Sequence, residues 1–338
     1  MTTLAPVLFF AATAASFLLT GIIRRYALRN AILDKPNERS LHTNPTPRGG
    51  GLAIVASLLS STIALHLMGR LSRETMIALF GAIPIAAVGW LDDKKGVSPK
   101  VRFPIHILSA LWALFWIGGM PTLMLGSHVL TIGHIIGGLL AVIGIVWATN
   151  LYNFMDGSDG IAGAEALTIG LTGAMLLWTA GAVGLSLLSL ATAGAALGFL
   201  FWNWSPAKIF MGDVGSGTLG FWFAVLALGS ERSMAVPATL WGLIAGVFVV
   251  DATLTVLRRA MRREQLHVAH RTHGYQRMVA AGWTHRRVAS AVIAINVALA
   301  LIAFVAQRIP ELDYLVVAAG FIMLFGVYIL VERRSPMK

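Results

Sequence analysis

Long apolar runs alternate with short polar segments along the whole chain. Eleven runs are long enough to cross the ~30 Å hydrocarbon core of a bilayer as helices. They cover approximately 4–23, 51–69, 75–91, 103–119, 130–149, 161–180, 182–202, 214–230, 234–257, 288–307 and 312–331. The sixth and seventh would together make a helix about 61 Å long, so we expect the chain to fold back near 181–184. The pattern predicts an all-α integral membrane protein, one multi-pass domain of about eleven transmembrane helices over residues 1–338.

Composition and charge agree with the membrane class. The chain is 57% hydrophobic and 12% charged, with a mean hydropathy of +0.76. Its net charge of +11 is confined to short loops between apolar runs, which is the membrane pattern and argues against a nucleic-acid partner. The absence of cysteine excludes disulfides, thiolate metal sites and a cysteine nucleophile.

The basic residues also predict an orientation. Of 26 lysines and arginines, 22 lie in one set of loops and the C-terminal tail. Only Arg70, Arg73, Arg232 and Arg308 lie on the opposite side. Because cytoplasmic loops carry the excess of Lys and Arg, we expect the N-terminus outside and the C-terminus inside.

Five polar clusters fall on the side that this orientation makes cytoplasmic. They are residues 46–50 (Thr-Pro-Arg-Gly-Gly), 91–95 (Leu-Asp-Asp-Lys-Lys), 150–163, 210–216 (Phe-Met-Gly-Asp-Val-Gly-Ser) and 270–273 (His-Arg-Thr-His). Agreement of all five by chance is roughly a 1-in-16 event if each loop can fall on either side with equal frequency. We therefore expect one cytoplasmic active site assembled from loops.

The stretch 150–163 is the most polar segment between two long apolar runs. Asn150, Asn153 and Asp156 recur every three residues, so they would share one face of a helix. Asp159 adds a second carboxylate, and no Lys or Arg within the stretch neutralises the pair. Oxygen ligands of this kind suit Mg²⁺ or Mn²⁺. The alternative is a polar loop with an Asx-type cap.

Carboxylates and basic groups together indicate a diphosphate substrate. A metal ion held by acidic groups would bridge phosphate oxygens, while Arg and Lys take the remaining charge. The glycine-rich turn 212–217 could add backbone N–H groups at a helix N-terminus. Its G-x-G-x-x-G spacing is not a dinucleotide motif, because no βαβ unit surrounds it. The candidates are Asp92, Asp93, Asp156, Asp159 and Asp213 with Arg48, Lys94, Lys95, Lys100, Arg258 and Arg259.

In this order, the motifs resemble those of the polyprenyl-phosphate N-acetylhexosamine-1-phosphate transferases. The motifs are Pro-Thr-Pro-Arg-Gly-Gly (45–50), Asp-Asp-x-x (92–95), Asn-x-x-Asn-x-x-Asp-Gly-x-Asp-Gly (150–160), Phe-Met-Gly-Asp-x-Gly-Ser (210–216) and a His-containing basic loop (267–277). The resemblance covers essentially the whole chain, including the eleven-helix layout. The loop 267–277 lacks the His-rich run of the peptidoglycan enzyme and is more similar to the O-antigen-initiating branch.

The resemblance implies a reaction at the cytoplasmic face of the bacterial inner membrane. Undecaprenyl phosphate would attack a UDP-N-acetylhexosamine, release UMP and start a lipid-linked glycan. A homodimer is a further expectation. The implied metal ligands, for Mg²⁺ or Mn²⁺, are Asn153 and Asp213; the catalytic carboxylates are Asp92, Asp93, Asp156 and Asp159; and the substrate-binding residues are Arg48, Lys94, Asn150, Arg258, Arg259, His270 and His273.

Other interpretations stay open at this point. The runner-up function is a peptidoglycan lipid-I-type translocase, and a more distant one is a secondary transporter, which would place ionisable groups near the bilayer midplane. Asp92 with Asp93 could be a solvated turn, and His270 with His273 could be ordinary interfacial histidines. For both Asp251 and Glu165, which lie inside apolar runs, a functional role and a contact within the helix bundle are equally open. We expect the remaining histidines to be boundary residues, namely His66, His106, His128, His134 and His285.

Overall fold

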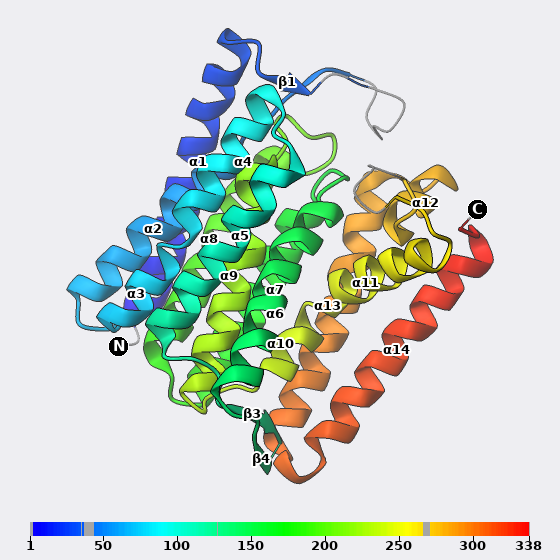
Figure 1. Cartoon of the computed structure of the whole chain (residues 1–338). Helices are drawn as coiled ribbons and strands as arrows, with labels where there is room; N and C mark the ends of the chain where they lie inside the picture. The colour runs from blue at the N-terminus through cyan, green and yellow to red at the C-terminus, as the bar shows by residue number, and fades with distance from the viewer. Residues whose placement is uncertain (1–2, 35, 37–43, 127, 266–270, 338) are drawn as a thin grey trace.

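The structure, a computed structural model, describes residues 3–34, 36, 44–126, 128–265 and 271–337. This part of the chain is mostly helical, with two short antiparallel hairpins (Figure 1). The hairpins pair β1 (Leu33–Asp34) with β2 (Thr46–Pro47), and β3 (Thr122–Leu125) with β4 (His128–Thr131). The helices are α1 (Leu4–Arg29), α2 (Gly51–Leu67), α3 (Arg73–Leu79), α4 (Ala82–Lys95), α5 (Pro99–Ile117), α6 (His134–Met155), α7 (Ile161–Thr179), α8 (Val183–Asn203), α9 (Asp213–Arg232), α10 (Ala238–Ile244), α11 (Gly246–Met261), α12 (Gly274–Ala280), α13 (His285–Arg308), the 3₁₀ turn η1 (Pro310–Leu312) and α14 (Asp313–Arg334).

The predicted all-α, multi-pass membrane fold is confirmed. Among the described residues, eight segments are long and apolar enough to cross a membrane, and a ninth is the bent pair α10–α11. The other two predicted runs form α2, with 17 residues, and α9, with 20. The fold-back near 181–184 occurs where α7 ends and α8 begins, and these two helices pack against each other. Each of the eleven apolar runs therefore contains a helix or a pair of helices.

The ninth run differs from the continuous span that its apolarity predicts. It bends by 83° between α10 and α11. Its C-terminal half carries Asp251, a charge that a straight helix would have to bury in apolar surroundings. The bend instead places Asp251 against α12 and Arg258 against α14.

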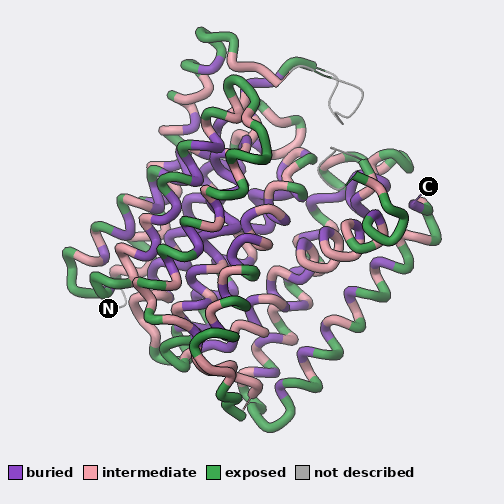
Figure 2. The backbone as a smooth tube through the Cα atoms, in the orientation of Figure 1, coloured by how far each residue is buried: buried purple, intermediate pink, exposed green. Residues whose placement is uncertain are grey.

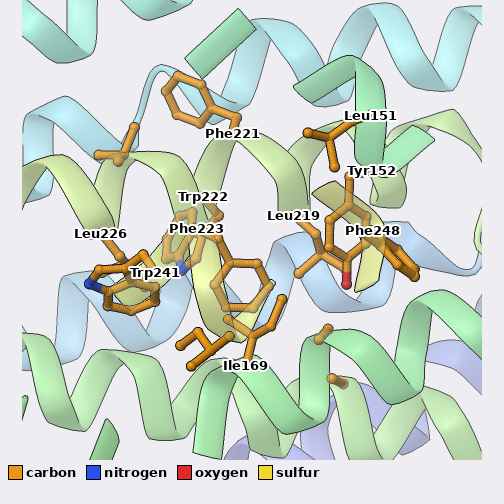
Figure 3. Packing of buried hydrophobic residues seen from close by; sticks show 14 of the residues in the cluster. Leu151, Tyr152, Ile169, Leu219, Phe221, Trp222, Phe223, Leu226, Trp241 and Phe248 are labelled. Atoms are coloured by element: carbon orange, nitrogen blue, oxygen red, sulfur yellow. The ribbon is translucent and has the colours of Figure 1, made fainter. Parts of the chain in front are cut away.

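Helix α9 lies at the centre of the bundle. It packs against α2, α4, α5 and α6, and most of its residues are buried (Figure 2). Phe221, Trp222 and Phe223 extend from it toward the surrounding helices, where Tyr152 of α6 meets Phe248 of α11 with ring centroids 5.0 Å apart (Figure 3). Because other helices surround α9, its glycines and serines let the neighbouring backbones approach closely.

Two glycines set how closely the neighbouring helices approach the start of α9. A Cβ atom on Gly89 of α4 would lie 2.6 Å from the backbone carbonyl of Asp213, and one on Gly51 of α2 would lie 2.6 Å from the backbone nitrogen of Gly215. Only glycine permits this contact. The carboxylates one turn beyond Gly89 are thereby brought to the first turn of α9.

The two ends of the bundle give a direct test of topology. Ser98 and Ser233 are both exposed and lie in the loops before α5 and after α9, at the ends predicted to be cytoplasmic and external. Because the chain has no cysteine, Ser233→Cys should react with a membrane-impermeant maleimide in intact spheroplasts, and Ser98→Cys only after permeabilisation. If both variants label from the same side, the number of helices predicted between them is wrong. If Ser98→Cys labels in intact spheroplasts and Ser233→Cys only after permeabilisation, the predicted orientation is reversed.

Candidate active site

Two arginines join three aspartates from four separate segments. Arg48, in the loop before α2, contacts Asp93 at 2.7 Å through Nε and Asp213 at 2.8 Å through Nη2. Arg102 of α5 contacts Asp92 at 2.8 Å and Asp213 at 2.6 Å through Nη1. The carboxyl groups of Asp92 and Asp213 also contact each other. Asp213 is therefore the hub of the cluster.

Asp93 organises the start of α9. Its carboxylate accepts the backbone N–H groups of Asp213 at 2.9 Å and Val214 at 3.2 Å, so it caps this helix from α4. Favourable interaction of an anion with a helix N-terminus explains the arrangement. The glycine-rich turn 212–217 was expected to offer such N–H groups to a ligand, and the structure instead shows two of them bonded to Asp93.

The central stretch approaches the hub from α6. The Asn153 amide donates to the Ser216 hydroxyl at 3.1 Å and also contacts Asp213. Asn150, one turn earlier, donates to the Val146 carbonyl at 2.7 Å and lies 3.4 Å from His106 of α5. A cavity of about 30 Å³ lies between these helices, and its polar lining consists of Arg102, His106, Thr149, Asn150, Asn153 and Asp213.

The two remaining aspartates of the stretch differ in their surroundings. Asp156, half-buried just after α6, has a pKa raised well above its ordinary value by burial; the Arg48 charge opposes this shift and Asp213 adds to it. Asp159 accepts the backbone N–H of Ala207 at 3.0 Å. Asp159 thus ties the central loop to the loop before α9, while Asp156 belongs electrostatically to the cluster.

Other candidate residues lie on different partners. The Lys94 ammonium lies 4.5 Å from the Trp90 ring centre and also above the Tyr26 ring. Arg258 donates to Glu332 at 2.6 Å and 3.0 Å. These contacts point both side chains toward partners outside the aspartate cluster.

The basic loop is only partly described. Arg259 donates to Glu264 at 2.7 Å. His273 is buried, with its Nδ1 atom 3.7 Å from Asp251, and its ring stacks on Phe154. His270 lies outside the described residues. Of the fifth polar cluster, His273 thus reaches the central stretch at Phe154.

The sequence does not single out Arg102, and it predicts His106 to be a boundary residue, yet both belong to the site. Arg102 bridges two of the candidate carboxylates, and His106, one turn further along α5, lines the same cavity. Both lie in the first turns of an apolar run, where a basic residue is ordinarily assigned to the membrane boundary. The available signal was the spacing, because Arg102 follows Asp92 by ten residues across a short turn.

The charges of the cluster do not balance. Three carboxylates, those of Asp92, Asp93 and Asp213, contact two guanidinium groups, which leaves one negative charge when all three are ionised. Asp156, whose pKa is raised by burial, adds a second negative charge only when it is ionised. Burial alone would lower the pKa of Arg48, but the Asp93 and Asp213 carboxylates outweigh it and raise that pKa. A divalent cation would neutralise the excess.

The donor set fits magnesium better than a softer metal. No group of three or more His, Cys, Asp or Glu side chains within the described ranges is arranged to hold a metal ion. Mg²⁺ is ordinarily held by one or two carboxylates together with water and substrate phosphates. Asp213 and Asn153 supply a carboxylate and an amide at one place, and oxygen ligands match a hard cation. The arrangement thus suits a site completed by a phosphate-bearing substrate.

Comparison with known proteins places these features in context. The family model described as glycosyl transferase family 4 matches residues 75–231, the part of the chain that carries Asp92, Asn153 and Asp213. A Bacillus subtilis protein named "Probable undecaprenyl-phosphate N-acetylglucosaminyl 1-phosphate transferase" is 34% identical, over 83% of this chain and 78% of the relative.

Two further relatives differ in the sugar that they are named for. A Mycobacterium tuberculosis decaprenyl-phosphate N-acetylglucosaminephosphotransferase is 29% identical, over 95% of this chain and 87% of the relative. A Shouchella clausii phospho-N-acetylmuramoyl-pentapeptide-transferase is also 29% identical, over 83% and 89%. The likeness to both kinds extends far beyond the matched family region.

Proposed function

This chain belongs to the polyprenyl-phosphate N-acetylhexosamine-1-phosphate transferases of glycosyl transferase family 4, and on that premise we propose that it transfers N-acetylhexosamine-1-phosphate from a UDP-sugar to undecaprenyl phosphate. It is a phospho-sugar transferase and a multi-pass protein of a bacterial membrane. The observation that carries the proposal is the meeting of four polar segments at Asp213. An oxygen-rich, arginine-bearing cluster at one end of an apolar bundle suits a reaction between a lipid phosphate and a soluble diphosphate.

The reaction forms one bond and breaks one. A phosphate oxygen of undecaprenyl phosphate attacks the β-phosphorus of the UDP-sugar. The bond between that phosphorus and the oxygen bridging it to the α-phosphorus breaks, and UMP leaves with the bonding electrons. The product is undecaprenyl-diphospho-N-acetylhexosamine. Because a phosphate monoester with a second pKa near 6 is already mostly dianionic at pH 7, positioning contributes more than deprotonation.

The proposed roles follow from the contacts. Arg48 and Arg102, poised around Asp213, would hold phosphate oxygens that gain charge in the transition state. Asp213 and Asn153 would hold Mg²⁺, or Mn²⁺, which when bound neutralises the diphosphate. Asp92, which also accepts the backbone N–H of Val97, would face the lipid phosphate. Asp93 supports the site by capping α9.

The sugar is proposed to be a plain N-acetylhexosamine. The relatives named for N-acetylglucosamine transfer include the one at 34% identity and one aligned over 95% of this chain. The loop 267–277 also lacks the His-rich run of the peptidoglycan enzyme. The product would then initiate O-antigen or a related envelope polysaccharide on the cytoplasmic side. Muramoyl-pentapeptide transfer is the runner-up, supported by relatives such as that of Shouchella clausii.

The first test is turnover by the purified protein. With Mg²⁺ and undecaprenyl phosphate, we expect UMP release from UDP-N-acetylglucosamine or another UDP-N-acetylhexosamine, measured by chromatography across a panel of sugars. UDP-N-acetylmuramoyl-pentapeptide should release none. Release from the pentapeptide substrate alone would favour the runner-up, and no UMP from any sugar would refute the proposal.

The second test concerns the hub. Asp213→Asn should lower kcat by at least about 10³-fold, because it removes the anionic ligand of a catalytic cation. Asp313→Asn, at a buried carboxylate at the start of α14, is the matched control and should retain turnover. Full activity of Asp213→Asn, or of the native enzyme in excess EDTA, would contradict the metal assignment.

A further inference from the structure

Asp251 makes a set of contacts that no catalytic role explains. It lies on α11 beyond the bend, and its side chain is 12% exposed. The carboxylate accepts the backbone N–H groups of Gly274 at 2.7 Å and Tyr275 at 3.1 Å, the first turn of α12. The Thr255 hydroxyl donates to it at 3.2 Å. A buried carboxylate is tolerated when its oxygens are hydrogen-bonded, and here they fasten α12 to α11.

Helix α12 in turn covers the end of α6. The Tyr275 hydroxyl donates to the backbone carbonyl of Phe154 at 3.1 Å, and Tyr275 is buried. The His273 ring stacks with the Phe154 ring, at a centroid distance of 6.3 Å, and with the Tyr275 ring, at 6.0 Å. Gly157 is packed so closely that a Cβ there would lie 3.2 Å from Cζ of Tyr275. The first residues of α12 therefore fix the backbone between Phe154 and Gly157.

That backbone carries the site residues. Asn153 precedes Phe154, and Asp156 follows it by two positions. Asn153 is held on its other side by Ser216 of α9. Two of the contacts that hold the last turn of α6 flank the site residues, one to α9 through Asn153 and one to α12 through Phe154. Only the second depends on Asp251.

We infer that Asp251 is a positioning residue: it docks α12 against the end of α6 and thereby sets where Asn153 and Asp156 stand relative to Asp213. The inference deepens the proposed function and rests on it for its kinetic consequences. Both carboxylate oxygens are used by the α12 backbone, so Asp251 acts through α12 and Phe154. The geometric part concerns this chain alone.

The variant to test is Asp251→Asn, which keeps the shape but presents an NH₂ group to one of the two backbone donors. The matched control is Glu231→Gln. Glu231 is also a buried carboxylate that accepts two backbone N–H groups, from Ala238 at the start of α10 at 2.6 Å and from Met124 of β3 at 2.5 Å, and it touches neither α6 nor α12 through them. The pair separates a general loss of stability from the effect on the site.

Two readouts decide the inference. Hydrogen exchange of the amides in 150–163, measured without substrate or metal, should be faster than wild type in Asp251→Asn and unchanged in Glu231→Gln. In turnover, Asp251→Asn should lower kcat about 10- to 100-fold. It should also raise the half-saturating Mg²⁺ concentration about tenfold, because a displaced supporting contact weakens metal binding. KM for undecaprenyl phosphate should stay close to that of the wild type. The melting temperature of Asp251→Asn should stay close to that of Glu231→Gln.

The outcomes are distinguishable. Unchanged exchange over 150–163 in Asp251→Asn would overturn the inference whatever the kinetics. Equal loss of activity in both variants, at equal melting temperature, would also overturn it, because the effect would then be one of stability. If wild-type protein releases no UMP from any UDP-sugar, the proposed function fails, while the exchange comparison still decides whether Asp251 positions the α6 end.

Discussion

The site depends on the contact of two arginines with the Asp213 carboxylate. Arg48 comes from a loop and Arg102 from α5, yet both reach Asp213 at hydrogen-bond distance. This requires the start of α9 to lie directly against α4, which Gly89 permits by having no side chain. Because these ion pairs are partly buried, removing one member leaves its partner with less compensation than water would give. The helices must approach closely before the charges can neutralise each other.

The apolar bundle explains why such an assembly is chemically useful. Helix α9 is enclosed by aromatic and aliphatic side chains, so its charged first turn lies beside a region of low polarity (Figure 3). Charges in such surroundings act more strongly on one another than charges in water. The excess of carboxylates over guanidinium groups attracts a cation, while the arginines suit phosphate oxygens. One end of the protein thus gathers groups that suit the lipid phosphate and the nucleotide diphosphate of the proposed reaction.

The sequence predicted the helices well and the site in part, for physical reasons. A segment in the lipid must satisfy its backbone hydrogen bonds internally, so a long apolar run is sufficient to predict a helix without any helical periodicity. The eleven apolar runs therefore located the helices. The 83° bend was not predictable from apolarity, since Asp251 finds its partners on α12, far along the chain. Motif residues such as Asp92 and Asn153 stood out because they interrupt apolar sequence. Arg102 did not, because a basic residue at a span end is ordinary and its two carboxylate partners become visible only in three dimensions.

If the cluster around Asp213 catalyses transfer of a phospho-sugar, the β-phosphorus of the donor must follow the sugar into the lipid. A UDP-N-acetylhexosamine carrying radioactive phosphorus at the β position would be incubated with the purified protein and undecaprenyl phosphate, and the lipid and water phases separated. We expect the label to enter the lipid together with the sugar, leaving unlabelled UMP in water. Label remaining in water as UDP, with sugar in the lipid, would show ordinary glycosyl transfer and rule out phospho-sugar transfer by this protein.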